Sequence, residues 1–228
     1  MYILSYSASV ITFLLYRSIF NIIGMNFETT GVYHVYNLGN NRQSIFFNRE
    51  NYFFFLRKIR IHILPFADIL AWCLMPNHFH LMICVREISA TVGVTLSHPD
   101  SSGSIAKAIS LNSSIGIMLR SYTRAINNQE KRSGALFREE TKAICLNETK
   151  GILPNWNTSV GVTILRVEIP EFQYPQVCFN YIHNNPVKAG LVKNPEDWEF
   201  SSYFEIKEMR SDSLINLEKV KELGILSG

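Results

Sequence analysis

The sequence has few cysteines, and none of them stands in a spacing that binds metal or supports redox chemistry. The four cysteines of this 228-residue chain form no CxxC pair and follow no zinc-knuckle spacing. Because structural zinc sites need closely spaced thiolate and imidazole ligands, this pattern excludes that class. We therefore expect reduced and mostly buried thiols, as in a cytoplasmic protein, at Cys73, Cys84, Cys145 and Cys178.

A strong net charge is also lacking. The chain has 22 Lys and Arg against 19 Asp and Glu, a net charge of +3, which neither demands nor excludes a nucleic-acid partner. The excess is nevertheless concentrated within residues 120–142, which hold six basic and three acidic residues. With 47% hydrophobic and 18% charged residues, the chain can bury a core, which excludes wholesale disorder and suits one domain.

The N-terminal segment, residues 1–24, is apolar and carries one charge, Arg17. No basic region precedes the apolar run, so a signal peptide is not expected. The run is long enough to span a bilayer, but a charge near its middle costs about 3 kcal/mol on insertion scales. Three explanations stay open: a start placed too early, with the working protein beginning at Met25, a membrane anchor, or an additional packed helix. We treat the segment as an extension and do not expect a membrane partner.

Hydrophobic periodicity predicts an alternation of strands and helices in the remaining chain. Asn48 can cap the first helix, Pro186 should end a later one, and residues 86–104 should form a loop. Residues 147–172 look like an inserted loop or hairpin in a domain over residues 25–210. We expect strands at 32–38, 45–47, 69–85 (interrupted at Pro76) and 141–146, and helices at 49–64, 110–128, 176–184 and, in a tail over 211–228, at 217–223.

The order of these elements predicts an α+β fold. A β-α-β-(α)-β-α sequence suits a ferredoxin-like or RRM-like sandwich, with a mainly antiparallel sheet and helices on one face. No internal repeat or low-complexity tract interrupts it.

The most informative local pattern is His78-Phe79-His80, within residues 75–82. Residues two apart in a strand point to the same face, so the two imidazoles converge while Phe79 faces the core. Such a pair can bind one divalent metal ion, or it can simply be hydrogen-bonded. Two ligands are too few for a metal site, so a third would have to come from elsewhere in the chain.

Candidate partners lie on the helix that Pro175 opens. Tyr181 and Asn185 are four residues apart and therefore share a helix face. Their phenol and carboxamide could both reach the histidine pair. Alternatively, Tyr181 is an ordinary core residue. His183 projects to another side of this helix and is left outside the metal shell.

Several sequence blocks resemble the single-tyrosine HUH transposases, and more closely the REP-associated tyrosine transposases and their transposase-like relatives. HUH denotes the His-hydrophobic-His pattern, here His78-Phe79-His80. The resemblance covers roughly residues 33–203, in matching order and spacing. The blocks are YHVYN with GN at residues 33–40, MPNHFHLM at 75–82, YIHNNPVKAG at 181–190 and DWEFSSY at 197–203.

The resemblance implies a metal-dependent enzyme that cleaves and rejoins single-stranded DNA. By position, His78 and His80 match two ligands of Mg²⁺ or Mn²⁺, Asn185 matches the third ligand, and Tyr181 matches the nucleophile. The implied intermediate is a 5′-phosphotyrosine link with a free 3′-hydroxyl, formed on hairpin repeats. The implied surroundings are the cytoplasm and the nucleoid. The tyrosine could act in cis or in trans, as a monomer or a homodimer.

The basic stretch is interpreted as a set of clamps on the DNA backbone, or else as a solvated helix face. Tyr122 is a rival nucleophile because it lies between two arginines, but the residue four positions later, Ile126, cannot bind metal. A catalytically silent module that binds single-stranded DNA or RNA is the alternative function. The expected DNA-binding residues are Arg120, Arg124, Lys131, Arg132 and Arg138.

Overall fold

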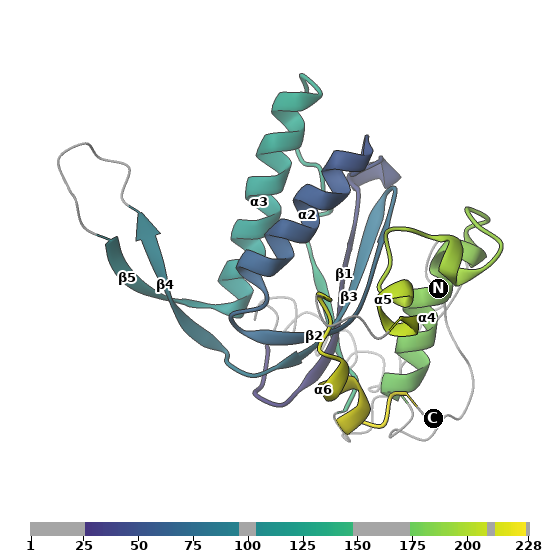
Figure 1. Cartoon of the computed structure of the whole chain (residues 1–228). Helices are drawn as coiled ribbons and strands as arrows, with labels where there is room; N and C mark the ends of the chain where they lie inside the picture. The colour runs from purple at the N-terminus through teal and green to yellow at the C-terminus, as the bar shows by residue number, and fades with distance from the viewer. Residues whose placement is uncertain (1–25, 96–103, 148–173, 209–212, 227–228) are drawn as a thin grey trace, which may run out of the picture.

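The computed structural model describes residues 26–95, 104–147, 174–208 and 213–226 (Figure 1). The apolar N-terminal extension and the expected insertion at 147–172, apart from its first residue, lie outside these ranges. None of the helices in the described ranges is long and apolar enough to cross a membrane.

A four-stranded sheet forms the centre of the molecule. It consists of β1 (Val32–Leu38), β2 (Ala67–Met75), β3 (His78–Val85) and β6 (Lys142–Cys145), in the order β2-β3-β1-β6. Every neighbouring pair is antiparallel, which confirms the α+β class and the mainly antiparallel sheet. The two central strands, β1 and β3, are the ones that carry the YHVYN and HFH blocks.

Two helices, α2 (Arg49–His62) and α3 (Leu111–Gln129), cover one face of the sheet. Asn48 caps α2 as predicted, because its side chain accepts a hydrogen bond from the Asn51 backbone in a capping box. Ser110 caps α3, because its side chain accepts a hydrogen bond from the Ser113 amide. Apolar side chains from both helices meet the odd-numbered residues of β3, such as Phe79 and Leu81, in the larger hydrophobic cluster. The predicted boundaries of both helices are confirmed to within two residues.

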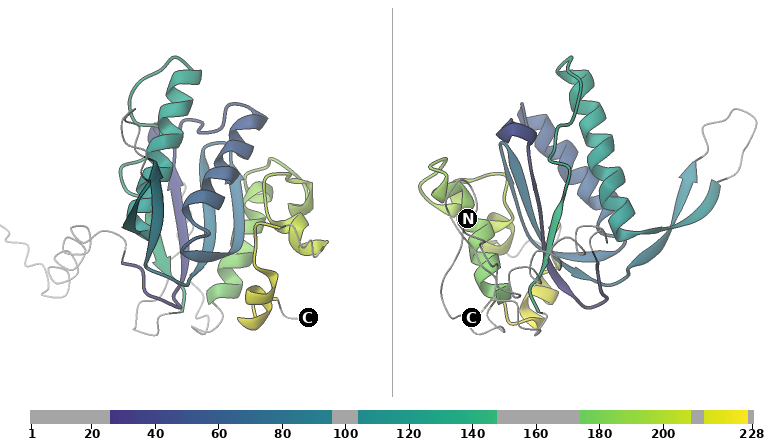
Figure 2. Two further views of the ribbon diagram at one scale, coloured as in Figure 1. Left: turned by 60° about the vertical axis from the view of Figure 1, so that its left-hand side comes forward. Right: turned by 180° about the vertical axis from the view of Figure 1, so that it is seen from behind.

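The helix α4 (Tyr174–Lys188) lies on the opposite face of the sheet (Figures 1 and 2). The expectation that helices occupy one face therefore holds for α2 and α3 only. The expected stop at Pro186 is wrong, because this proline lies inside α4. The helix ends at Lys188, and Gly190 follows with a φ of 69°, which suits a residue without a side chain. There the Leu191 amide donates to the Pro186 carbonyl at 3.0 Å, and the Gly190 amide donates to Val187 at 2.9 Å.

The loop expected at 86–104 is wrong for residues 89–95 and 104, which lie in strands, while residues 96–103 lie outside the described ranges. The segment contains β4 (Ser89–Thr95), which pairs with β5 (Ser104–Ser110) in an antiparallel two-stranded ribbon. The ribbon projects away from the sheet (Figure 1). Its polar composition indicated a loop, but the β-branched residues Thr91, Val92 and Val94 are typical of a strand.

The short strand expected at residues 45–47 is also absent from the described structure. A 3₁₀ turn, η1 (Asn40–Arg42), follows β1 instead. Ile45 is fully buried, and its amide donates to the Pro76 carbonyl at 2.8 Å. The apolar run reflects core packing rather than a place in the sheet.

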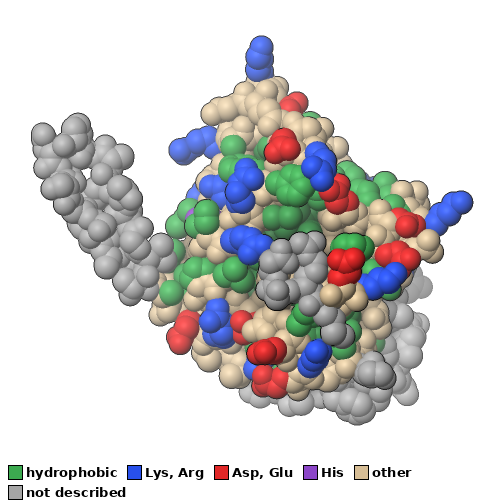
Figure 3. Space-filling model, in the orientation of Figure 1, with side chains coloured by type: hydrophobic (Ala, Val, Ile, Leu, Met, Phe, Trp, Pro, Cys, Tyr) green, Lys and Arg blue, Asp and Glu red, His purple; other side chains and the backbone are tan. Residues whose placement is uncertain are grey.

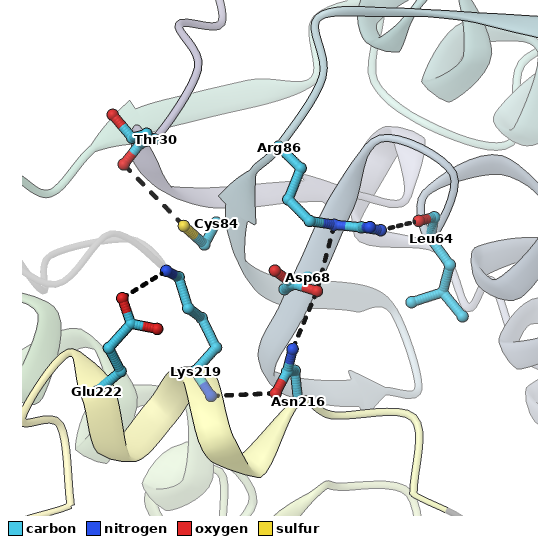
Figure 4. A network of polar contacts seen from close by, with 8 residues as sticks. All are labelled: Thr30, Leu64, Asp68, Cys84, Arg86, Asn216, Lys219 and Glu222. Carbon is cyan, nitrogen blue, oxygen red and sulfur yellow. Dashed lines mark hydrogen bonds and ion pairs between the residues drawn. The ribbon is translucent and has the colours of Figure 1, made fainter.

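The C-terminal helix α6 (Leu217–Glu222) is fastened to β2 by polar contacts (Figure 4). Asn216 caps the helix by accepting a hydrogen bond from the Lys219 amide, and it also donates to the Asp68 carboxylate at 3.1 Å. Asp68 forms an ion pair with Arg86 at 3.3 Å. Two further helical segments, η3 (Pro195–Asp197) and α5 (Tyr203–Lys207), connect α4 to α6. The contacts of Asn216 and Asp68 position the C-terminal segment, which lies beside α4.

Candidate functional site

The two histidines of the HFH block lie side by side on the α4 face of the sheet. Their ring centroids are 4.9 Å apart in an edge-to-face arrangement, while Phe79 points into the core beneath α2. His80 is buried, with 4% of its surface exposed, and His78 is partly buried. Asn77 holds the His78 ring through a contact of 2.6 Å between its Oδ1 and Nδ1. The alternation predicted from the sequence is therefore observed.

The neighbouring strand β1 adds a third imidazole and a phenol. His34 lies against His80, with 2.9 Å between His34 Nε2 and His80 Nδ1. Tyr36 is the direct cross-strand partner of His80, and its ring stacks on His34 at 4.8 Å. These residues share a face because His34 and Tyr36 are two apart in the strand.

Helix α4 brings Tyr181 and Asn185 to the same place. The Tyr181 ring meets His80 edge-on at 5.4 Å and His34 at 5.9 Å between centroids. The Asn185 side chain hydrogen-bonds His78, and its Nδ2 also donates to the Tyr181 carbonyl at 3.2 Å. One helical turn separates the two residues, so a single helix face supplies both groups. The Lys188 ammonium lies 5.2 Å from the centre of the Tyr181 ring.

Burial keeps the imidazoles of this site neutral. It lowers the pKa of His34 to about 3 and that of His80 well below its usual value. Burial also lowers the pKa of His78 to about 4, although the hydrogen bond that the imidazole donates to Asn185 opposes that shift. Burial raises the pKa of Tyr36, as does the nearby Tyr181. Neutral imidazole is the form that binds metal ions.

The donor atoms fit a divalent ion held by two imidazoles and one amide. Nε2 of His80 is buried and has no hydrogen-bond partner among the described residues, so no other described group occupies the position that an ion would take. His78 and Asn185 lie next to it and are already in contact with each other. No cluster of three or more His, Cys, Asp or Glu able to hold a metal occurs in the described ranges. An ion at this site would therefore depend on Asn185 and on substrate oxygens.

Tyr122, the rival nucleophile, lies on the other face of the sheet. Its side chain is fully buried in the cluster formed by α2 and α3, and its hydroxyl donates to the Ile45 carbonyl at 2.8 Å. Burial raises its pKa far above the usual value for tyrosine. The structure therefore brings Tyr181 to the histidines and keeps Tyr122 in the core.

A groove of about 640 Å³ runs between α3 and residues 132–141. Asn37 of β1 lies at its border and fixes this segment by donating to the Arg138 carbonyl at 3.2 Å and to Thr141 at 2.9 Å. In Figure 3, Lys and Arg side chains lie over the face that α2 and α3 present, with hydrophobic side chains between them. Lys131 is not among the groove residues. Four predicted DNA-binding residues line it: Arg120, Arg124, Arg132 and Arg138.

Sequence reasoning placed three residues outside this site: His34 and Lys188, which it gave no role, and Tyr36, which it considered only for stacking on DNA bases. His34 and Tyr36 carried a usable signal, because strand alternation places them on one face of β1 beside the HFH strand. Lys188 lies seven residues after Tyr181, which is two helical turns and hence the same face. His183 was left out of the metal shell, and its Nε2 instead contacts the Ser202 hydroxyl at 2.8 Å.

Comparisons with known proteins give likenesses in structure alone. No protein-family model matches the chain, and no curated protein matches its sequence. The structure is similar to a REP-associated tyrosine transposase bound to a REP hairpin, with a TM-score of 0.49 and 18% identity over 81% of this chain and 83% of that one. It is also similar to a bacterial tRNA(His) guanylyltransferase-like protein in complex with GTP, with a TM-score of 0.33 and 9% identity over 81% and 78% of the two chains. The ATP complex of such a protein gives 0.34 and 9% over 83% and 75%. At these TM-scores and identities the likenesses carry no argument about function, which is argued below from the residues of the site.

Proposed function

We propose that the protein is a metal-dependent endonuclease and transposase of the HUH type that acts on single-stranded DNA. Tyr181 is the proposed nucleophile, and His78, His80 and Asn185 are the proposed ligands of Mg²⁺ or Mn²⁺. The observation that carries the proposal is the edge-on contact of Tyr181 with His80 at 5.4 Å. A phenol and an amide from α4 and two neutral imidazoles from β3 converge on one point.

Each side chain of the site has a separate role in the proposed reaction. Tyr181 Oη attacks the scissile phosphorus, the bond from phosphorus to the 3′ oxygen breaks, and that oxygen takes up a proton. The product is a 5′-phosphotyrosine link and a free 3′-hydroxyl, so rejoining needs no ATP. When bound, a divalent ion supplies Lewis-acid polarisation of the phosphate. Asn185 links a proposed metal ligand to the proposed nucleophile, because it contacts both His78 and the Tyr181 backbone.

The Tyr181 hydroxyl needs help to react at neutral pH, because a phenol has a pKa near 10. Lys188 lies 5.2 Å from the ring centre and places a positive charge beside it. A positive charge nearby favours the phenolate over the phenol. Because Tyr181 contacts His80 of its own chain, we propose that it acts in cis. A homodimer stays a prediction.

The groove beside α3 is the proposed path of the DNA backbone. Four arginines line it, and guanidinium groups bind phosphates through paired hydrogen bonds. The substrate we propose is single-stranded or hairpin DNA. The strand β1 contributes to both places, with Tyr36 at the histidine site and Asn37 at the groove.

A covalent-adduct assay tests the proposal. The protein is incubated with single-stranded oligonucleotides that carry the hairpin repeats flanking its own gene, labelled on the 3′ side of the cleavage site, with and without Mn²⁺. We expect a labelled band that resists denaturing gel electrophoresis with the wild type and with Tyr122→Phe, but not with Tyr181→Phe or without the metal ion.

Two outcomes would contradict this proposal. Hairpin binding by the wild type without any adduct would indicate a silent binding module instead. An adduct that persists in Tyr181→Phe and vanishes in Tyr122→Phe would move the nucleophile to the other face of the sheet.

A further inference from the structure

We propose that His34 is a positioning residue that sets the tautomer of His80, so that His80 presents an Nε2 lone pair to the metal site. The inference deepens the proposed function and rests on it. It assigns a specific task to a residue of β1 that would not itself touch the ion or the DNA.

The contact between the two rings is direct and enclosed. His34 Nε2 and His80 Nδ1 lie 2.9 Å apart, and the exposed fractions of the two residues are 1% and 4%. The separation is that of a hydrogen bond, so one proton lies between the two nitrogens. Neighbouring groups also fix the His34 ring, which stacks on Tyr36 at 4.8 Å and meets Tyr181 edge-on.

The position of that single proton decides what His80 can do. If His34 Nε2–H donates to His80 Nδ1, the proton of a neutral His80 is on Nε2, and that nitrogen cannot bind a metal. If His80 Nδ1–H donates to His34 Nε2, then His80 Nε2 carries a lone pair. Only in the second arrangement can His80 Nε2 bind a metal ion. This nitrogen is buried without a hydrogen-bond partner in the described ranges. Histidines that bind metals usually donate their other ring N–H in this way.

The arrangement also determines the tautomer of His34 itself. A neutral His34 that accepts through Nε2 must carry its proton on Nδ1. The pair is therefore expected to contain two Nδ1–H imidazoles, in a fixed order from His34 to His80 to the site. A substitution of His34 that keeps a hydrogen-bond acceptor near the position of Nε2 should preserve the Nδ1–H tautomer of His80. A substitution without an acceptor should not.

Two measurements test this assignment, and the first needs no metal and no DNA. Long-range ¹H–¹⁵N spectra of the metal-free protein distinguish the two imidazole tautomers, and we expect His80 in the Nδ1–H form. The second is Mn²⁺ affinity, measured by titration with electron paramagnetic resonance. We expect His34→Phe to weaken Mn²⁺ binding by about 10- to 100-fold, as is usual for the partner of a metal ligand. We expect His34→Gln to keep most of the affinity, because its amide oxygen can accept the same hydrogen bond.

The matched control is Tyr122→Phe, which removes a buried hydrogen bond from the opposite face. It should leave Mn²⁺ affinity unchanged. An Nε2–H tautomer at His80 in the metal-free protein would overturn the inference, and so would equal affinity in wild type and in folded His34→Phe. Neither result would affect the adduct assay with Tyr181→Phe. If the wild type itself bound no Mn²⁺, the proposed metal site would fail, and the tautomer spectra would still decide the role of His34.

Discussion

The two faces of the central sheet bury side chains of different chemistry, although they belong to the same strands. Beneath α2 and α3 the sheet presents apolar residues such as Phe79, Leu81 and Val35, all at most 1% exposed. On the α4 face the alternate positions of the same two strands include His34 and His80, also nearly inaccessible to solvent. Burying polar rings costs free energy unless they are paired. A face that keeps several of them is better explained by chemistry than by stability.

The two tyrosines that the sequence offered as nucleophiles illustrate the same difference. Tyr122 is fully buried, and its hydroxyl donates a hydrogen bond to a backbone carbonyl. Tyr181 is partly exposed and contacts imidazoles. Both lie on apolar stripes of helices, so the helix pattern alone does not separate them. Their surroundings do, because only one of them lies on the face that carries the histidines.

A large effect is expected from removing the side-chain amide of Asn185 on the α4 face. Asn185→Ala should weaken Mn²⁺ binding by at least about 10-fold, since it deletes a proposed ligand and its contact with His78. Calorimetric titration with Mn²⁺ measures this. The control is Asn184→Ala, which removes a similar bond, from Nδ2 to the Asn180 carbonyl at 2.8 Å. Equal losses in both variants would mean that the amide supports the helix rather than an ion.

A second expectation concerns His183, a buried histidine of the same helix that does not join the site. Burial lowers its pKa from 6.5 to about 4, so the unfolded chain binds the proton more tightly. Its contribution to stability is complete above pH 6.5 and is lost as the pH falls toward 4. For His183→Gln, we expect the decrease in unfolding free energy between pH 7 and pH 5 to be smaller by about 2 kcal/mol. Urea unfolding at both pH values measures it, and an unchanged decrease would show that His183 is protonated in the folded state.

A third and smaller effect should show whether DNA binds in the groove rather than elsewhere on the surface formed by α2 and α3. Arg124→Gln should weaken hairpin binding several-fold and reduce the slope of log affinity against log salt by about 1. Arg57→Gln is the control, because Arg57 lies over the Phe54 ring of α2 and does not line the groove. Fluorescence anisotropy between 50 and roughly 200 mM salt is a suitable measurement. Equal slopes for both variants would refute the groove as the DNA path.

The smallest effect is expected at Lys188. Lys188→Met removes the cation beside Tyr181, whose positive charge favours the phenolate over the phenol. We expect adduct formation at pH 7 to slow by about 2- to 5-fold, with recovery at higher pH as the phenol ionises without help. Rates across this pH range provide the test. A deficit that is the same at every pH would assign Lys188 to binding instead.

Much of this fold could be read from local sequence signals. The Asn48 cap, the alternation through His78 and His80, and the turn at Pro76 each depend on neighbours within a few residues, and the structure confirms them. The ribbon of β4 and β5 was missed because its composition is polar. The end of α4 was misplaced because a proline near a helix end removes only one hydrogen bond, while Gly190 closes the helix.

The candidate site shows which features local sequence signals do not predict. Spacing by itself established that His78 and His80 share a face, that Tyr181 and Asn185 share another, and that the positive charge is concentrated in residues 120–142. Only the tertiary structure decided that α4 lies over the histidine face, that His34 contacts His80, and that Tyr122 is a core residue. Periodicity fixes the direction of a side chain relative to its own strand or helix. Which faces then meet depends on packing between elements far apart in the chain, and no local pattern encodes that.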